Sequence, residues 1–264
     1  MSALIPRSRP RVAAFFDLDK TIIATSSTLA MTRPLLHSGL LTNVTVIKAV
    51  VAQLQYALVG TNHDQTMRMK DQLTALVRGW DAGQLRGVVA DAFDRYLEPQ
   101  VHVEALEQIA LHREMGHDIV IVSASAQDFV DPVAARLGVD HTLATVLEEE
   151  DGRYTGGIAR YMYRQAKADA IVELAAAHGY DLSQCYAYTD SITDLPMLEA
   201  VGYPYVVNPD RALRAEANAR NWRILSFHRA VNLPRRRTLS GAAALTALGL
   251  GLLLGWLWRR KRRR

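Results

Sequence analysis

Pairs of oxygen-bearing side chains follow three short apolar segments that lie far apart in the sequence. The pairs are Asp17 with Asp19, Ser123 with Ser125, and Thr189 with Asp190. In an open parallel sheet the carboxyl ends of the strands meet in one crevice, where ligands bind. If the three apolar segments are neighbouring strands, these side chains therefore converge on one site.

Four aspartates would share that crevice: Asp17, Asp19, Asp190 and Asp194. Carboxylates crowded in this way repel one another unless a hard divalent cation lies among them. Mg²⁺ suits this role because it takes oxygen ligands and often binds together with a substrate phosphate. A lysine and a hydroxyl nearby would complete a phosphate site, the lysine as a charge and the hydroxyl as a donor. Taken singly, the aspartates and the serine could instead cap a helix or close an Asx turn, and the lysine could be a solvated helix residue.

The elements that must position these groups alternate between strand and helix. Residues 12–16 form a short apolar run, and residues 28–97 carry mostly helical patterns. From residue 98 onward we expect helices between strands at 118–122, 141–147, 185–189 and 203–207, with a hairpin at 150–158. This order predicts an α/β fold, a doubly wound parallel sheet formed by residues 1–24 and 98–233, with an all-helical insert at 25–97.

Four ordered segments resemble the motifs of the haloacid dehalogenase (HAD) superfamily, and more narrowly its phosphoserine-phosphatase-like branch, subfamily IB. They are DLDKT at 17–21, Ser123 after DIVIV, Lys167 at the start of a helix, and DSITDLPML at 190–198. The resemblance extends over residues 11–226 and makes the helical insert a cap on a Rossmann-like HAD core. It implies an enzyme, a phosphoric monoester hydrolase that uses Mg²⁺.

The resemblance also implies a role for each matching residue. Asp17 would attack phosphorus and become an aspartyl-phosphate, and Asp19 would protonate the leaving oxygen and then activate water. The implied metal ligands are Asp17, the backbone carbonyl of Asp19, and Asp190, with Asp194 behind them or reaching the metal through water. The implied phosphate-binding residues are Thr21, which would orient the loop, Ser123, Lys167 and Thr193.

Two positions depart from the family pattern. Ser26 stands where phosphoserine phosphatases have a glutamate for the amino group of their substrate. A neutral hydroxyl cannot supply that charge-assisted contact, so phosphoserine is disfavoured as the substrate. Thr193 replaces the usual asparagine of the fourth motif and offers one donor where an amide has two.

Composition and charge narrow the class of protein. The 264 residues are 49% hydrophobic and 22% charged, which excludes a disordered chain, and the single cysteine, Cys185, excludes a disulfide scaffold. The net charge is +4, but nine basic residues lie at 235–237 and 259–264. Because the positive charge is concentrated at the C-terminus, we expect no nucleic-acid partner.

Residues 234–264 indicate a membrane anchor with basic flanks. The 20 residues from Leu239 to Trp258 carry no charge, and a helix of that length spans ~30 Å, the thickness of the hydrocarbon core of a bilayer. A buried core helix and an in-plane or re-entrant helix are the alternatives. Small residues at every fourth position from 243 to 255 suggest a homodimer through this helix.

The basic flanks leave the orientation open. The positive-inside rule alone would place the more basic tail in the cytoplasm. The apolar run at 12–16, however, is too short for a signal peptide. We therefore expect a single-pass protein of the cell membrane with a cytoplasmic catalytic domain.

The expected substrate is a phosphorylated small molecule or a lipid phosphate. Residues 40–59 of the insert are apolar on nearly every face of a helix, which is typical of a buried helix but also suits contact with acyl chains. The predicted function is a membrane-anchored, Mg²⁺-dependent phosphatase that forms an aspartyl-phosphate. A phosphotransferase, or a membrane-bound regulatory protein that keeps a phosphate pocket, is the alternative.

Overall fold

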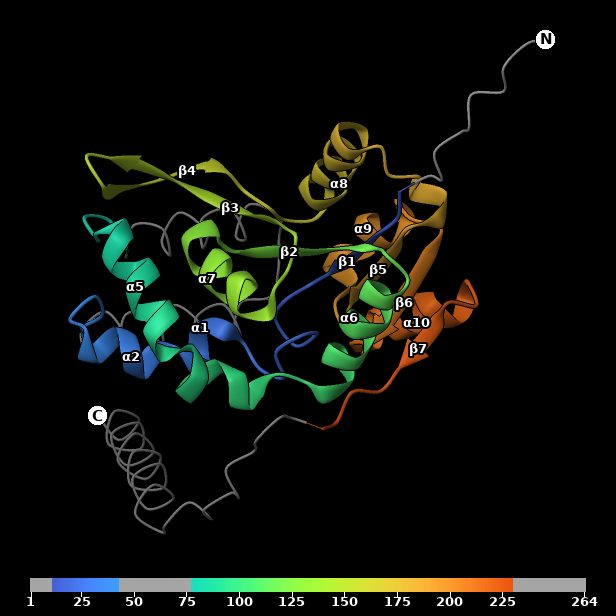
Figure 1. Ribbon diagram of the computed structural model, residues 1–264, viewed down its shortest axis with the longest axis horizontal. Helices are drawn as coiled ribbons and strands as arrows, with labels where there is room; N and C mark the ends of the chain where they lie inside the picture. The colour runs from blue at the N-terminus through green and yellow to red at the C-terminus, as the bar shows by residue number, and fades with distance from the viewer. Residues whose placement is uncertain (1–10, 43–76, 230–264) are drawn as a thin grey trace, which may run out of the picture. The chain divides into compact units, whose positions relative to one another are not determined.

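The computed structural model describes residues 11–42 and 77–229 (Figure 1). Within these residues, seven strands form one sheet in the order β4-β3-β2-β1-β5-β6-β7. The strands are β1 (Ala13–Phe16), β2 (Asp118–Ala126), β3 (His141–Glu150), β4 (Arg153–Arg160), β5 (Tyr186–Thr189), β6 (Tyr203–Val207) and β7 (Arg223–Leu225). All neighbouring pairs are parallel except β3 and β4, which form an antiparallel hairpin. The predicted parallel α/β sheet is confirmed, and β7 is a short edge strand that the sequence analysis missed.

Helices connect the parallel strands. They are α1 (Ser27–Ala30), α2 (Thr32–His37), α5 (Ala82–Ala92), α6 (Val103–Glu114), α7 (Gln127–Leu137), α8 (Gln165–His178), α9 (Leu195–Glu199) and α10 (Arg211–Ala219). Local chemistry sets several of their ends. The Asp81 carboxylate accepts a hydrogen bond from the Gln84 amide at the start of α5, and Gly138 takes the left-handed conformation that ends α7.

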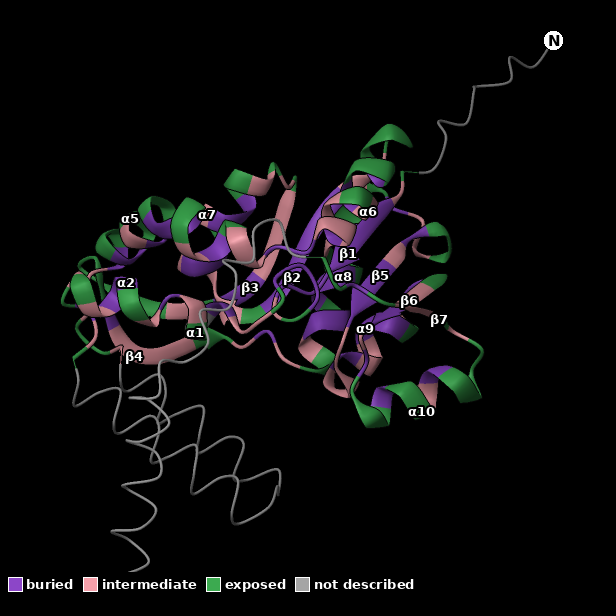
Figure 2. Cartoon of the chain, turned by 90° about the horizontal axis from the view of Figure 1, so that it is seen from below, coloured by how far each residue is buried: buried purple, intermediate pink, exposed green. Residues whose placement is uncertain are grey.

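Strand β1 lies at the centre of the fold, and all four of its residues are buried. Its side chains alternate between two hydrophobic clusters, one on each face of the sheet. Phe16 packs in the cluster that includes α6 and α7, whereas Phe15 packs in the cluster that includes α8, α9 and α10. Figure 2 shows the central strands in the colour of buried residues. Helices on both faces therefore exclude water from the strands that lead to the site.

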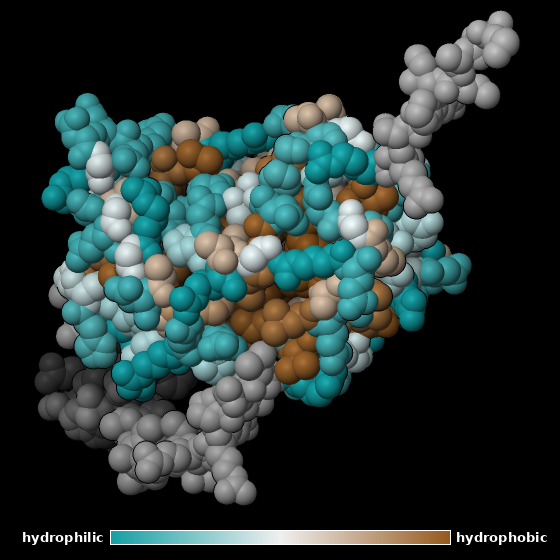
Figure 3. Space-filling view, viewed as in Figure 1, coloured by the Kyte–Doolittle hydropathy of each residue, from teal (hydrophilic) through white to brown (hydrophobic). Residues whose placement is uncertain are grey.

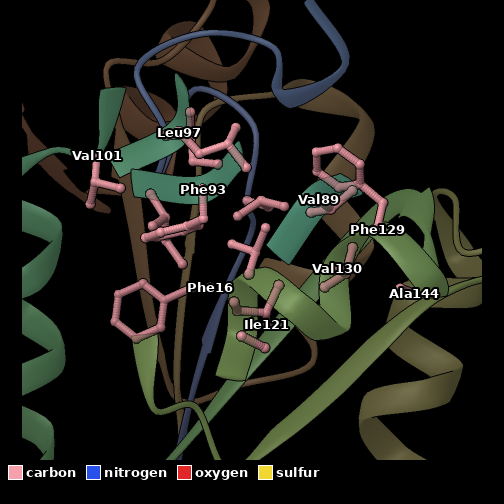
Figure 4. Packing of buried hydrophobic residues seen from close by; sticks show 14 of the residues in the cluster. Phe16, Val89, Phe93, Leu97, Val101, Ile121, Phe129, Val130 and Ala144 are labelled. Atoms are coloured by element: carbon pink, nitrogen blue, oxygen red, sulfur yellow. The ribbon is translucent and has the colours of Figure 1, made fainter. Parts of the chain in front are cut away.

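The described part of the helical insert shares the first of these clusters. Val89 of α5, with Phe93 and Leu97 of the following π-helix η1 (Phe93–Leu97), packs near Phe16 and Ile121 of the sheet (Figure 4). The insert is thus part of the same hydrophobic core as the strands. In the insert, residues 27–37 and 82–97 are mainly helical. Its middle, 43–76, lies outside the described residues, and the predicted domain boundaries stay a prediction.

Backbone hydrogen bonds also join the insert to the β3–β4 hairpin. The Gly79 amide donates to the Tyr154 carbonyl at 2.8 Å, the Tyr154 amide donates to the Trp80 carbonyl at 3.0 Å, and the Ala82 amide donates to the Gly152 carbonyl at 3.0 Å. Residues 79–82 therefore continue the edge of the hairpin, although they lie in the stretch for which the sequence analysis predicted mostly helices.

Hydrophilic residues cover most of the face drawn in Figure 3, with hydrophobic residues showing between them in the lower centre of the view. In residues 11–42 and 77–229, no helix has the length and apolar character needed to cross a membrane. The predicted membrane helix at 239–258 lies outside the described residues.

Candidate active site

The sheet register brings the first two predicted motif segments beside the fourth. Phe16 of β1 lies opposite Ile121 of β2 and Tyr188 of β5. The Asp17 amide extends this pairing by donating to the Tyr188 carbonyl at 2.9 Å. Asp17 therefore leaves the sheet at the carboxyl edge, between the ends of β2 and β5, as the sequence analysis expected.

Lys167 lies at the centre of the site. Its Nζ donates to Asp17 Oδ1 at 2.8 Å and to Asp194 Oδ2 at 2.7 Å. The side chains are 3%, 10% and 4% exposed for Lys167, Asp17 and Asp194. Thr189, the last residue of β5, donates from Oγ1 to Asp194 Oδ2 at 2.8 Å. Three segments of the chain, at residues 17, 167 and 189–194, thus meet in one buried network of ion pairs and hydrogen bonds.

Burial governs the ionisation of this network. Burial raises the pKa of Asp17 to about 8, Lys167 opposes the rise, and the charge of Asp194 adds to it. Burial by itself would lower the pKa of Lys167, but the charges of Asp17 and Asp194 raise it above its ordinary value, so the lysine stays protonated. Asp17 is therefore the carboxyl group that an additional cation would keep ionised.

Asp19 is held by contacts that the sequence analysis did not foresee. Its Oδ1 accepts a hydrogen bond from the backbone amide of Ser27, the first residue of α1, at 2.6 Å. Its Oδ2 accepts from the Ser125 hydroxyl at 3.3 Å. Ser125 in turn donates its amide to Ser123 Oγ at 3.1 Å. The predicted acid–base residue therefore links the loop after β1, the insert and the end of β2.

Asp190 follows β5 on the other side of the site. Burial raises its pKa to about 6, the positive charge of Lys20 opposes the rise, and Asp194 adds to it. Asp194 therefore lies within electrostatic reach of both Asp17 and Asp190. These interactions agree with a shared acidic site, although no hydrogen bond joins Asp17 to Asp190 among the described residues.

Two predicted phosphate-binding residues have other surroundings. Thr21 is completely buried, and its hydroxyl has no hydrogen-bond partner among the residues that the structure describes. Thr193 Oγ1 lies 3.0 Å from Ser191 Oγ, within the loop after β5. Their roles toward phosphate stay predictions. The sequence analysis recognised Ser125 and Thr189 only as polar residues at strand ends. It did not predict that Ser125 would bond to Asp19 and Thr189 to Asp194.

The chemistry of this donor set fits a hard divalent cation. Asp17 and Asp190 offer carboxylate oxygens as ligands. Burial raises the pKa of both carboxyl groups, and a nearby cation would stabilise them in the ionised form. In the described ranges, no three His, Cys, Asp or Glu side chains are grouped closely enough to hold a metal ion by themselves. A bound Mg²⁺ would therefore take further ligands from backbone oxygen, water or phosphate, as it does in many phosphate sites.

The fold and the site are those of a hydrolase family. The model of the haloacid dehalogenase-like hydrolases matches residues 14–199. The chain belongs to this family. The membership confirms the expectation of an enzyme, a hydrolase of the HAD type. Phosphatases among the relatives of this chain support a phosphoric monoester hydrolase, and the fold is similar to that of a phosphoserine phosphatase of known structure.

Individual relatives agree with this assignment. A probable phosphatase of Mycobacterium tuberculosis is 51% identical over 248 residues, which cover 93% of this chain and 86% of the relative. A phosphoserine phosphatase of the same species is 31% identical over 239 residues, covering 90% of this chain and 76% of that protein. A crystal structure of a Bordetella pertussis protein of unknown function has a TM-score of 0.71 and 27% identity, covering 82% and 98% of the two chains.

Proposed function

We propose that this enzyme hydrolyses phosphate monoesters in two steps through an aspartyl-phosphate on Asp17, with Mg²⁺ in the site. The observation that supports the proposal best is the contact of Lys167 with Asp17. Because Nζ holds Oδ1 at 2.8 Å, the nucleophile is oriented, and Oδ2 has no hydrogen bond from the described residues. Oδ2 is therefore the oxygen for attack on phosphorus.

In the first step the Asp17 Oδ2–phosphorus bond forms and the ester oxygen–phosphorus bond breaks, while Asp19 gives its proton to the leaving oxygen. In the second step Asp19 takes a proton from water, whose oxygen attacks phosphorus and releases Asp17 and phosphate. The contacts of Asp19 with the Ser27 amide and the Ser125 hydroxyl hold its carboxyl group in place. Lys167 keeps a positive charge beside the reacting oxygens.

The metal would be held by Asp17, Asp190 and the backbone carbonyl of Asp19. When bound, it neutralises negative charge on the phosphoryl group. Asp194 positions the lysine in this proposal. Its carboxylate accepts a hydrogen bond from Lys167, which also bonds to Asp17, and another from the Thr189 hydroxyl, which holds Asp194 in place.

The test is hydrolysis of 4-nitrophenyl phosphate by the purified full chain. We expect activity with Mg²⁺, its loss in EDTA, and a fall of at least about a thousandfold for Asp17→Asn. Asp169→Asn is the matched control, because Asp169 lies exposed on α8 and, among the described residues, its side chain bonds only to Gln165. The phosphoenzyme should be trapped by acid during turnover. Full activity of Asp17→Asn would refute the proposal, and transfer of the phosphoryl group to added alcohol would reveal a phosphotransferase.

The same proposal includes attachment to the cell membrane through residues 239–258, with the catalytic domain in the cytoplasm and a lipid phosphate among the substrates. Its support is the uncharged run of that segment between two basic clusters. Membrane fractionation of the full chain and of a chain ending at residue 233 tests the anchor. Hydrolysis of lysophosphatidate in detergent micelles, compared with soluble esters, tests the substrate. Equal recovery of both chains in the soluble fraction would contradict the anchor.

A further inference from the structure

Strand β2 leaves its regular pairing with β3 where it enters the site. The pairing runs from Val122 opposite Leu143 to Ala126 opposite Thr145, so β2 advances from 122 to 126 while β3 advances only from 143 to 145. Residues 123–125 therefore form a bulge. Bulges bend a strand and re-aim its side chains, and they are common beside active sites.

Side chains on both sides hold this bulge. Thr145 Oγ1 donates to the Ala124 carbonyl at 2.8 Å and accepts from the Met162 amide at 3.1 Å. On the other side, the Ser125 amide donates to Ser123 Oγ at 3.1 Å. Thr145 and Ser123 are only 3% and 1% exposed. The backbone at residue 125 is therefore fixed by buried contacts.

The hydroxyl of Ser125 points to the proposed acid–base residue. Its Oγ donates to Asp19 Oδ2 at 3.3 Å, and among the described residues it has no other hydrogen bond. It does not cap α7, because the N-cap of that helix is Ala126 and no side chain bonds there. Asp19 and Ser125 are both partly exposed, so a substrate can reach them.

The two carboxyl oxygens of Asp19 have partners of different kinds. Oδ1 accepts from the backbone amide of Ser27 at 2.6 Å. A backbone amide can only donate, so a proton on Oδ1 would face another hydrogen atom. A hydroxyl can donate or accept, so Oδ2 can carry or lack a proton and keep Ser125 as its partner. The proton that Asp19 transfers therefore lies on Oδ2.

We infer that Ser125 is a positioning residue, which directs Oδ2 of Asp19 to the oxygen of the leaving group. The inference rests on the proposed function. As the ester oxygen–phosphorus bond breaks, its electron pair stays on the leaving oxygen, and the proton passes to that oxygen from Oδ2. The Ser125 hydroxyl then donates to the carboxylate that remains. Because the amide of Ser125 also holds Ser123, one residue aligns the acid with the predicted phosphate-binding hydroxyl.

The experiment compares two esters that differ in their need for a proton, 4-nitrophenyl phosphate and propyl phosphate. A nitrophenolate leaves readily without a proton, whereas an alkoxide needs one. We expect Ser125→Ala to lower kcat/KM by about tenfold or more for propyl phosphate and by less than about threefold for 4-nitrophenyl phosphate. The inhibition constant of inorganic phosphate should change by less than about twofold, because the backbone amide that holds Ser123 is still present.

Two variants of equal shape isolate the hydroxyl. Ser125→Thr keeps it and should retain the wild-type ratio of the two kcat/KM values, whereas Ser125→Val lacks it and should behave as Ser125→Ala. Ser183→Ala is the matched control. Ser183 is exposed and outside the site, and its hydroxyl likewise donates to an aspartate, Asp181, at 2.6 Å. Its removal should leave kcat/KM for both esters unchanged.

An equal loss for the two esters in Ser125→Ala would indicate a merely structural role and overturns the inference. So does an unchanged kcat/KM for propyl phosphate. The comparison of Ser125→Val with Ser125→Thr decides the question if the alanine variant does not fold, and equal ester ratios in these two variants overturn the inference. If the wild-type chain hydrolyses neither ester, the proposed function itself fails.

Discussion

Replacing Lys167 by methionine tests whether the buried ion pairs hold the site together. The Nζ atom lies 2.8 Å from Asp17 and 2.7 Å from Asp194, and all three side chains are at most 10% exposed. Lys167→Met removes the shared cation and leaves two buried carboxyl groups without it. Breaking a buried pair in this way costs about 3–5 kcal/mol, because the remaining charge is uncompensated. We expect the free energy of unfolding to fall by that amount and kcat/KM to fall by about a hundredfold or more.

The assay is urea unfolding at pH 7 in EDTA, followed by circular dichroism. Lys20→Met is the matched control, because Lys20 is exposed and has no ion pair among the described residues, so it should change stability by less than about 1 kcal/mol. The double variant Lys167→Met/Asp194→Asn should be less destabilised than the sum of its two single variants, by at least about 1 kcal/mol. If Lys167→Met costs no more than Lys20→Met, the ion pairs do not stabilise the site.

Stability should also depend on the buried His112. Burial, aided by the charge of the neighbouring His117, lowers the pKa of His112 from 6.5 to about 4. Between these pH values His112 binds a proton more readily in the unfolded chain than in the folded chain, so the free energy of unfolding falls as the pH drops from 6.5 to 4. We expect this fall to be about 2–3 kcal/mol larger in the wild type than in His112→Gln. Equal pH slopes of the two chains in urea titrations would contradict the prediction. Two glycine substitutions should act in opposite directions. Gly202→Ala would place Cβ 1.8 Å from the Ser183 carbonyl oxygen and should destabilise by at least about 2 kcal/mol, whereas Gly87→Ala in α5 meets nothing within 4 Å and should stabilise by about 0.5–1 kcal/mol in thermal unfolding.

The strands and their polar ends could be predicted because the pattern that encodes them is local. Residues 12–16 are apolar and end at Asp17, and the same change from apolar to polar occurs at Ser123 and at Asp190. The structure has β1, β2 and β5 in these places, parallel and adjacent. The helix that carries Lys167 was also evident from its pattern, and the structure has it at Gln165–His178.

Contacts between distant segments were harder to predict. The pairing of residues 79–82 with the β3–β4 hairpin depends on backbone hydrogen bonds, which any side chain permits, so no residue type signals it. Strand β7 has three residues, too few for a periodic pattern. The bond from the Ser27 amide to Asp19 is likewise a backbone contact, set by the position of α1.

The sequence by itself determined which chemistry is present, since the identity of Asp17, Asp19, Lys167 and Asp190 and their order along the chain define the motifs of the family. Tertiary structure alone decided how these groups are paired. Lys167 lies 150 positions from Asp17 and 27 positions from Asp194, yet it bonds to both. The physical reason is that periodicity and turn residues act over a few positions, whereas ion-pair geometry and burial arise only when helices and sheet pack and exclude water.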